Sequence, residues 1–408
     1  MRYDEVGLET SGMPKLRAGS LRVFPSCAFA RRVAHDCVLW MQCLANGGLM
    51  PDASGEAGKG ARDMNVMNMD FKRKLPIPQE TKEMYPLSQE LTEVIERRTD
   101  ELRAVFSGRS NKLVLIIGPC SADREDSVMD YITRLAAVQE KVADALLIVP
   151  RVYTNKPRTT GAGYKGLVHQ PDPQGDPDLF RGIIATRELH MRAVRETGFV
   201  CADEMLYPEN YKYVDDLLGY TAVGARSVEN QQHRLTASAV SVPVGMKTPT
   251  SGDLSVMLNA IEAAQQEHDF IYRGWEGHSR GNPYAHAILR GYVNRQGVTH
   301  PNYHYETLRY LAELYADRDV VNPAVIVDCN HSNSGKNPFE QPRILKEVLH
   351  SCRYDSRLKS LVKGFMVESY LEDGNQPVDG GVYGMSITDA CLGWKKSERL
   401  IFDIADML

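Results

Sequence analysis

Eight apolar runs of strand length follow one another through this chain of 408 residues. Most of them are continuous rather than alternating, which is typical of parallel strands buried on both faces. Stretches with helical spacing separate several runs, as Val128, Ile132 and Leu135 do between the first two. Strands that alternate with helices predict an α/β protein. The runs occupy residues 113–117, 146–149, 199–202, 222–225, 242–246, 270–272, 324–327 and 364–367.

The number and spacing of these units favour a (β/α)8 barrel, or TIM barrel, over its competitor, a doubly wound open sheet. Eight units within roughly 290 residues match the usual size of such a barrel. We therefore expect residues 113–400 to form a catalytic (β/α)8 barrel, with a helical lead-in at residues 76–112. Residues 1–75 include a stretch rich in Gly, Asp and Ser, and they are expected to be a poorly ordered N-terminal extension.

Composition argues against several functional classes. The formal net charge is -5, with 48 Lys and Arg against 53 Asp and Glu. This balance suits neither nucleic-acid binding nor attachment to an anionic membrane surface. No apolar stretch is long enough to span a membrane, and no signal peptide is evident. The eight cysteines include no C-x-x-C pair, so we expect reduced thiols and a cytoplasmic location.

Polar or ionisable side chains follow seven of the eight apolar runs. The carboxyl ends of the strands carry the active site in a (β/α)8 barrel, so these residues are expected to meet at one mouth. The alternative is that chains simply become polar where strands end, and each residue alone is weak evidence. The side chains in question are Cys120, Arg151, Asp203, Glu204, Arg226, Lys247, Asp328, His331 and Glu368.

A thiol, an imidazole and two carboxylates from separate segments form a candidate metal site. This mixed donor set suits one divalent transition metal ion. The choice among Mn, Fe, Co and Zn stays open, because availability rather than ligand type selects among them. A lone Cys after Gly-Pro is more often a small buried apolar residue, which is the simpler alternative for the thiol. The four residues are Cys120, His331, Glu368 and Asp389.

A second set of side chains is cationic and predicts anionic substrates, in the first place phosphates. Arginine offers phosphate a bidentate fork, and lysine offers a point charge. The loop at residues 156–160 combines two cations and two hydroxyl donors with a rigid proline. A solvated basic loop paired with surface carboxylates is the alternative. The candidate cations are Arg151, Lys156, Arg158, Arg226, Lys247 and Arg290.

Taken together, these motifs resemble the type I 3-deoxy-D-arabino-heptulosonate 7-phosphate (DAHP) synthases, which catalyse the first step of the shikimate pathway. The matching blocks are IIGPCS (116–121), PRVYTNKPRTTGAGYKGL (150–167), GARSVENQQHR (224–234), PVGMKT (243–248), ILRGY (288–292), VDCNHSNSGK (327–336), MVESYLEDGNQ (366–376) and YGMSITDACLGW (383–394). Three blocks depart from common family patterns: Ser-Val-Glu-Asn stands for Thr-Thr-Glu-Ser, Thr-Pro-Thr-Ser-Gly for Asn-Gly-Thr-Asp-Gly, and Gly-Ala-Gly-Tyr for Val-Gly-Trp. The charged positions survive in each.

The resemblance implies a reaction and a role for each site residue. Phosphoenolpyruvate, erythrose 4-phosphate and water would give DAHP and phosphate, which begins aromatic amino-acid biosynthesis. The implied metal ligands are Cys120, His331, Glu368 and Asp389. The implied phosphoenolpyruvate-binding residues are Arg151, Lys156, Arg226, Lys247 and Arg290, whereas Arg158 and Thr159 would hold erythrose 4-phosphate. Lys156 lies on the loop between both substrate sites, and we predict that it donates a proton.

The resemblance also implies regulation and assembly. Many relatives bind Phe, Tyr or Trp outside the barrel, at segments that resemble residues 204–211 and 270–274. Tyr272 is bulky where such relatives often have a small residue, so the identity of an effector stays open. A homo-oligomer is implied as well, although no sequence feature indicates the number of subunits.

Three rival interpretations differ in what they require of the sequence. The related 3-deoxy-D-manno-octulosonate 8-phosphate synthases are typically shorter and carry a K-A-N-R-S-type loop, which the loop at residues 156–160 does not match. A non-catalytic barrel would be indicated by the loss of a metal ligand, and all four are present. A fused chorismate mutase would need a longer helical segment than residues 85–106, and the last matching block already ends at residue 394.

Overall fold

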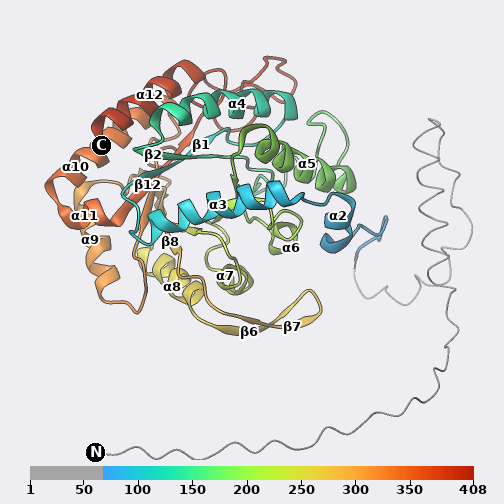
Figure 1. The fold of residues 1–408 in the computed structure, drawn as a ribbon, viewed down its shortest axis with the longest axis horizontal. Coiled ribbons are helices and arrows are strands. Elements are labelled where there is room, and N and C mark those ends of the chain that lie inside the picture. Colours follow the sequence, from blue (N-terminus) through green and yellow to red (C-terminus); the bar gives the residue numbers. More distant parts are fainter. Residues whose placement is uncertain (1–67) are drawn as a thin grey trace, which may run out of the picture. The chain divides into compact units, whose positions relative to one another are not determined.

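Eight parallel strands form the central sheet of the computed structural model, which describes residues 68–408 (Figure 1). The strands pair in the order β2-β1-β12-β11-β8-β5-β4-β3, so the first strand of the chain, β1, pairs with the last, β12. Arg151, directly after β2, also bridges Ala202 in β3, so the two outer strands meet and the barrel is nearly closed. This arrangement confirms the predicted (β/α)8 fold. The strands are β1 (Leu113–Gly118), β2 (Leu146–Pro150), β3 (Cys201–Glu204), β4 (Leu218–Val223), β5 (Val244–Lys247), β8 (Ala285–Leu289), β11 (Val325–Asp328) and β12 (Val362–Glu368).

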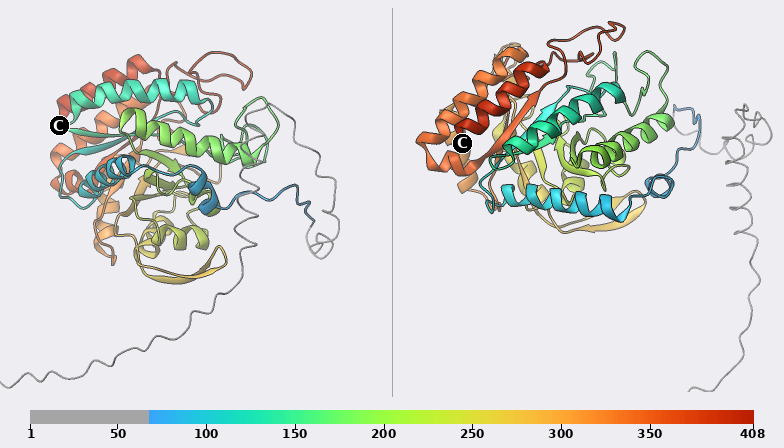
Figure 2. Two further views of the ribbon diagram at one scale, coloured as in Figure 1. Left: turned by 45° about the vertical axis from the view of Figure 1, so that its right-hand side comes forward. Right: turned by 45° about the horizontal axis from the view of Figure 1, so that its top comes forward.

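Helices surround the barrel (Figure 1, Figure 2). The longer ones, such as α4, α5 and α10, each bury a set of apolar residues. Helix α5 shows how the sequence sets their bounds: Asp178 accepts a hydrogen bond from the backbone nitrogen of Arg181, and Gly198 ends the helix in a left-handed conformation. The surrounding helices are α4 (Glu125–Val142), α5 (Leu179–Thr197), α6 (Pro208–Tyr211), α7 (Gln231–Ser238), α8 (Leu254–Gln265), α9 (Tyr305–Ala316), α10 (Gln341–Tyr354), α11 (Ser356–Leu361) and α12 (Trp394–Met407), with a 3-10 turn at Pro338–Glu340.

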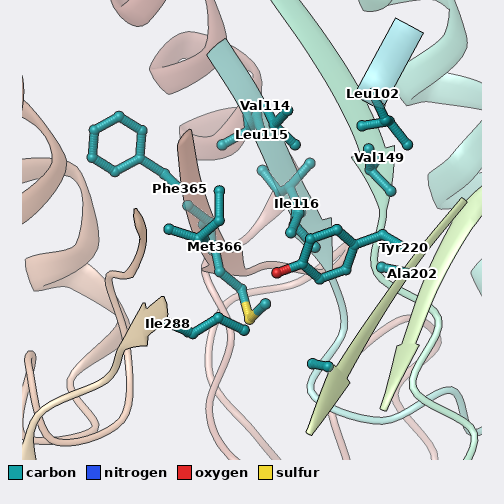
Figure 3. Packing of buried hydrophobic residues seen from close by; sticks show 14 of the residues in the cluster. Leu102, Val114, Leu115, Ile116, Val149, Ala202, Tyr220, Ile288, Phe365 and Met366 are labelled. Carbon is teal, nitrogen blue, oxygen red and sulfur yellow. The ribbon is translucent and has the colours of Figure 1, made fainter. Parts of the chain in front are cut away.

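Two further helices, α2 (Pro78–Met84) and α3 (Gln89–Phe106), precede the first strand. Helix α3 lies within the helical lead-in expected at residues 76–112 and packs against the amino-terminal end of the barrel. Its Phe106 ring stacks on His286 near the start of β8, with ring centroids 4.2 Å apart. The barrel interior beyond is filled by buried apolar side chains from several strands, including Ile116 and Met366 (Figure 3).

The sixth predicted strand is wrong. Residues 270–272 belong to an antiparallel hairpin of β6 (His268–Tyr272) and β7 (Trp275–Ser279), which is not part of the barrel sheet. The sixth barrel strand is β8, where His286 interrupts the apolar pattern. This histidine is tolerated inside the barrel because its Nε2 lies 2.8 Å from the Tyr220 hydroxyl and its Nδ1 lies 2.8 Å from the Tyr284 carbonyl oxygen.

Two smaller features complete the description. Strand β4 begins before the predicted run at residues 222–225, because Gly219 and Thr221 interrupt the apolar pattern that the prediction relied on. A second hairpin, of β9 (Tyr292–Val293) and β10 (Thr299–His300), follows β8. No helix among residues 68–408 is both long and apolar enough to cross a membrane. The expected N-terminal extension falls mostly in residues 1–67, outside the described residues.

Candidate active site

The carboxyl ends of the barrel strands bring the predicted site residues to one mouth. Lys247 and Glu368 are the last residues of β5 and β12, and Arg151 directly follows β2. Arg290 directly follows β8, so the corrected sixth strand also carries a charged group at its end. An open cleft of about 2250 Å³, which includes space open to solvent, lies at this mouth. Its lining includes Cys120, Arg151, Lys156, Arg158, Thr159, Arg226, Lys247, Arg290, His331 and Asp389.

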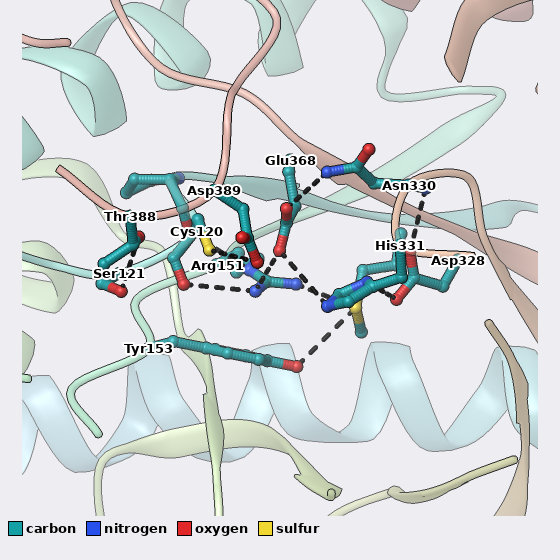
Figure 4. A network of polar contacts seen from close by, with 12 residues as sticks. Cys120, Ser121, Arg151, Tyr153, Asp328, Asn330, His331, Glu368, Thr388 and Asp389 are labelled. Atoms are coloured by element: carbon teal, nitrogen blue, oxygen red, sulfur yellow. Dashed lines mark hydrogen bonds and ion pairs between the residues drawn. The ribbon is translucent and has the colours of Figure 1, made fainter. Parts of the chain in front are cut away.

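The candidate metal ligands converge at one side of this cleft (Figure 4). Cys120 Sγ and one carboxylate oxygen each of Glu368 and Asp389 all lie within 4.8 Å of one another. His331 is not part of this tight group, but its Nε2 lies 3.8 Å from Oε1 of Glu368. One sulfur, one imidazole nitrogen and carboxylate oxygens are donors that a divalent transition metal accepts, so these residues fit such an ion.

Glu368 is fully buried, and its orientation is fixed from three sides. Oε1 accepts a hydrogen bond from Nη2 of Arg151 at 2.7 Å, and Oε2 accepts one from Nδ2 of Asn330 at 2.5 Å. The backbone nitrogen of Glu368 donates to Gln341 Oε1 at 2.8 Å. Burial raises the pKa of Glu368, but the charges of Arg151 and His331 outweigh burial and bring that pKa below its usual value. The carboxylate is therefore ionised at neutral pH.

His331 has an uncommon backbone conformation that turns its ring toward the ligands. Its φ of 46° lies in the left-handed region, which non-glycine residues adopt mainly at constrained, often functional positions. Its Nδ1 lies 2.7 Å from Oδ2 of Asp328, and its Nε2 points toward Glu368. A carboxylate behind a histidine is the usual arrangement at metal sites, because it fixes the tautomer and the ring orientation.

Lys156 lies between two of the candidate ligands. Its Nζ is 2.7 Å from Cys120 Sγ and 3.2 Å from Oδ2 of Asp389. Burial lowers the pKa of Lys156, but Cys120 and Asp389 raise it further than burial lowers it, so the side chain is held as an ammonium. Asp389 also contacts Lys336, with 3.0 Å between Oδ1 and Nζ. Burial raises the pKa of Asp389, and the two lysines together lower it well below its usual value.

Two buried cations share the ring of Tyr153 at the floor of the cleft. The guanidinium carbon of Arg151 lies 3.8 Å from the ring centroid, and Nζ of Lys247 lies 5.1 Å from it. Lys247 is paired with the buried carboxylate of Glu204. Both cations thus have a carboxylate partner, and the aromatic face between them adds a favourable cation–π contact.

The remaining predicted cations line the wall of the same cleft. Arg226 is exposed and Arg290 is half-buried. Nε of Arg158 donates to the carbonyl oxygen of Tyr164 at 2.8 Å, which fixes the guanidinium within its loop. The cleft therefore brings the whole predicted cation set into one space beside the candidate metal ligands.

Three side chains of the site were not singled out from the sequence: Tyr153, Asn330 and Lys336. All three fall inside the sequence blocks at residues 150–167 and 327–336, which was the available signal. Their roles depend on contacts with Lys247, Glu368 and Asp389, from distant parts of the chain, so residue type and local spacing could not indicate them.

This chain is similar to a known protein family, to curated relatives and to a solved structure. Residues 84–401 match the model of the DAHP synthetase I family. The Tyr-sensitive phospho-2-dehydro-3-deoxyheptonate aldolase of Escherichia coli (strain K12) is 34% identical over 350 residues, covering 84% of this chain and 95% of that protein. The Trp-sensitive enzyme of Enterobacter agglomerans is 36% identical over 330 residues, covering 79% and 91%. The solved structure of phospho-2-dehydro-3-deoxyheptonate aldolase from Francisella tularensis SCHU S4 is 28% identical, covers 83% of this chain and 98% of that chain, and has a TM-score of 0.77.

Proposed function

This chain belongs to the DAHP synthetase I family, and from that premise we propose that it is a cytoplasmic DAHP synthase. It would condense phosphoenolpyruvate with erythrose 4-phosphate and water, releasing DAHP and phosphate, at the start of the shikimate pathway. The observation that carries the proposal is the single cleft that combines a metal-donor set with the cations Arg151, Lys156, Arg158, Arg226, Lys247 and Arg290. Two phosphorylated substrates require such an excess of positive charge.

The four candidate ligands Cys120, His331, Glu368 and Asp389 would hold one divalent metal ion. When bound, that ion would supply Lewis-acid polarisation of the aldehyde oxygen of erythrose 4-phosphate. Glu368 and Asp389 contribute the negative charge that a divalent ion needs in a buried site. Two residues behind the ligands support the arrangement: Asn330 holds Glu368 through its amide, and Asp328 holds His331.

The cations are proposed to neutralise and orient both substrates. Arg151, Lys156, Arg226, Lys247 and Arg290 would take the phosphate and carboxylate of phosphoenolpyruvate, and Arg158 with Thr159 would take the phosphate of erythrose 4-phosphate. The buried partners Glu368 and Glu204 keep Arg151 and Lys247 in place before any substrate arrives. Preorganised charges of this kind stabilise the transition state without reorganisation, and they bring the reacting carbons together.

Lys156 is proposed to donate the proton that the reaction needs. When C3 of phosphoenolpyruvate attacks the aldehyde carbon, the former carbonyl oxygen becomes a hydroxyl and must gain a proton. The Lys156 ammonium lies at the edge of the candidate metal site, 2.7 Å from Cys120 Sγ, and it lines the substrate cleft. This position suits a general acid.

A substrate comparison tests the proposed activity. Phosphate release and phosphoenolpyruvate consumption would be measured with erythrose 4-phosphate and, separately, with arabinose 5-phosphate. We expect turnover with erythrose 4-phosphate, and an Arg158→Ala variant should raise KM for that substrate more than KM for phosphoenolpyruvate. Faster turnover with arabinose 5-phosphate, or no condensation with either sugar phosphate, would reject the assignment.

Regulation by an aromatic amino acid and assembly into a homo-oligomer form a second part of the proposal. Two relatives are named Tyr-sensitive and Trp-sensitive. In this chain Glu209 and Tyr272, from the two segments that the resemblance implicates, line one surface pocket together with Lys82. Inhibition assays with Phe, Tyr and Trp test the effector, and sedimentation velocity tests the assembly.

A further inference from the structure

Asp203 lies on the outer side of the barrel wall, yet it contacts the segment that carries Lys156. It is the third residue of β3, and the next residue, Glu204, lines the cleft and pairs with Lys247. Side chains alternate along a strand, so Asp203 faces the opposite way, toward His190 on α5. Both Asp203 and His190 are buried.

The Asp203 carboxylate accepts three hydrogen bonds, and two of them come from Thr154. Oδ1 accepts from the backbone nitrogen of Thr154 at 2.9 Å and from that of Glu204 at 2.7 Å. Oδ2 accepts from the Thr154 hydroxyl at 2.5 Å. Nε2 of His190 is 3.8 Å from Oδ2, which is beyond hydrogen-bond distance. Thr154 is therefore held by its backbone and its side chain at the same time.

This restraint reaches Lys156 along the chain. The carbonyl oxygen of Thr154 accepts from the backbone nitrogen of Val168 at 3.1 Å, and the backbone nitrogen of Lys156 donates to the carbonyl oxygen of Lys165 at 2.9 Å. Gly166 makes this close pairing of segments feasible, because a Cβ there would lie 2.4 Å from the Thr154 carbonyl oxygen. The segment 154–156 is thus fixed on both sides, and its far end places Nζ of Lys156 beside Cys120.

We propose that Asp203, through Thr154, is a positioning residue for Lys156. The inference rests on the proposed function, in which Lys156 donates a proton. Asp203 does not line the substrate cleft, so it would act through the geometry of segment 154–156 and not by contact with a substrate. Without the contact between Asp203 and Thr154, Nζ of Lys156 would move away from Cys120. The substrate-binding cations Arg151, Arg226 and Lys247 would stay in place. We therefore expect kcat to fall while the KM values change little.

The test compares Thr154→Val with conservative and control variants. Thr154→Val removes the hydroxyl at nearly constant volume, and we expect kcat to fall about tenfold or more with KM values within about threefold. Thr154→Ser keeps the hydroxyl and should restore kcat. Asp203→Asn should also retain most of kcat, because its amide can donate to a reversed Thr154 hydroxyl. Thr236→Val is the matched control, since Thr236 is another buried threonine whose hydroxyl has no partner within residues 68–408.

Hydrogen exchange provides a readout besides activity. The Thr154 amide donates to a buried carboxylate, so it should exchange slowly in the parent protein and faster in Thr154→Val. In Thr154→Val, Oδ2 of Asp203 loses its hydroxyl donor. If that variant fails to fold, the double variant Thr154→Val/Asp203→Asn removes the charge of Asp203, and we expect the same fall in kcat and the same faster exchange.

The outcomes separate the two proposals. A parent enzyme that makes no DAHP rejects the proposed function. An active parent whose Thr154→Val variant keeps kcat, or loses no more than Thr236→Val, rejects the positioning role alone, as does unchanged exchange of the Thr154 amide.

Discussion

Nη2 of Arg151 and Oε1 of Glu368 form a buried ion pair of 2.7 Å. Arg151 directly follows β2 and Glu368 is the last residue of β12. These two strands flank β1, and Cys120 follows β1. A candidate substrate cation is thereby joined directly to a candidate metal ligand. Buried ion pairs are stable when the remaining polar atoms are also satisfied, and the second oxygen of Glu368 accepts from Asn330.

Asn330→Ala should weaken metal binding without removing a ligand. The substitution leaves Oε2 of Glu368 without its 2.5 Å donor, so only the Arg151 contact at Oε1 still orients the carboxylate. Loss of such a supporting contact typically reduces metal affinity about 10- to 100-fold. Competition with a fluorescent chelator measures this change, and Asn259→Ala on the exposed side of α8 is the control. Equal affinity in both variants would contradict the role assigned to Asn330.

Two substitutions of Lys156 distinguish the role of its positive charge in substrate binding from its role as a proton donor. Lys156→Ala should lower kcat about 100-fold or more, which is the usual scale for loss of a general acid. Lys156→Arg keeps the positive charge but cannot release a proton at neutral pH, so kcat should stay low while KM for phosphoenolpyruvate recovers toward the parent value. Exposed Lys395→Ala is the control. Near-normal turnover by Lys156→Arg would show that charge alone suffices.

His286 predicts a pH dependence of stability that has no connection with the cleft. Burial lowers its pKa to about 3 despite a hydrogen bond with the Tyr284 carbonyl, whereas an unfolded chain has a histidine pKa of about 6.5. Between these values the unfolded state binds more protons, so stability falls as pH falls. The contribution from His286 should be about 2 kcal/mol smaller at pH 5 than at pH 7.

Urea unfolding of the parent protein and of His286→Gln at pH 5 and pH 7 measures the contribution of His286 to the unfolding free energy. The difference in unfolding free energy between the two proteins should shrink by that amount at pH 5. An identical difference at both pH values would mean that His286 has the same pKa in the folded and the unfolded protein.

Tyr272→Ser tests the proposed effector pocket. Tyr272 lines the surface pocket near Lys82 and Glu209, so a smaller side chain should leave more room for an aromatic amino acid. For at least one of Phe, Tyr and Trp we expect the half-inhibitory concentration to change about tenfold, with the uninhibited kcat unchanged. Ile271→Ser is the matched control, because Ile271 is 82% exposed on the same strand. If Tyr272→Ser and Ile271→Ser respond alike to all three amino acids, the pocket is not the effector site.

The local pattern of apolar residues was sufficient to predict most of the barrel strands, because buried parallel strands are continuous apolar runs. It failed where two segments competed for one strand position. Residues 270–272 are more apolar than β8, yet Ile271 is exposed in the hairpin and His286 is buried in the barrel. The contact that stabilises His286 joins it to Tyr220, 66 residues away, and no local pattern contains that information.

Site residues could be predicted from the sequence where they directly follow or end a barrel strand. Strand-end position placed Arg151, Lys247 and Glu368 at one mouth, but it treated Asp203 and Glu204 alike. Their alternation along β3 sends one to the cleft and the other to α5, which requires the exact strand register. The partners Asn330 and Lys336 lie in the loop after β11, whose conformation depends on a left-handed residue at His331.

Titration of metal-free protein most directly tests the central claim, that four ligands and a ring of cations make one metal-dependent synthase. The metal would be removed with EDTA, its absence verified by elemental analysis, and Mn, Fe, Co or Zn added back in fractions of an equivalent. We predict that DAHP formation from phosphoenolpyruvate and erythrose 4-phosphate rises to a plateau at one ion per chain. Cys120→Ser and Asp389→Asn should shift or abolish that plateau. Full turnover by verified metal-free protein would contradict the account.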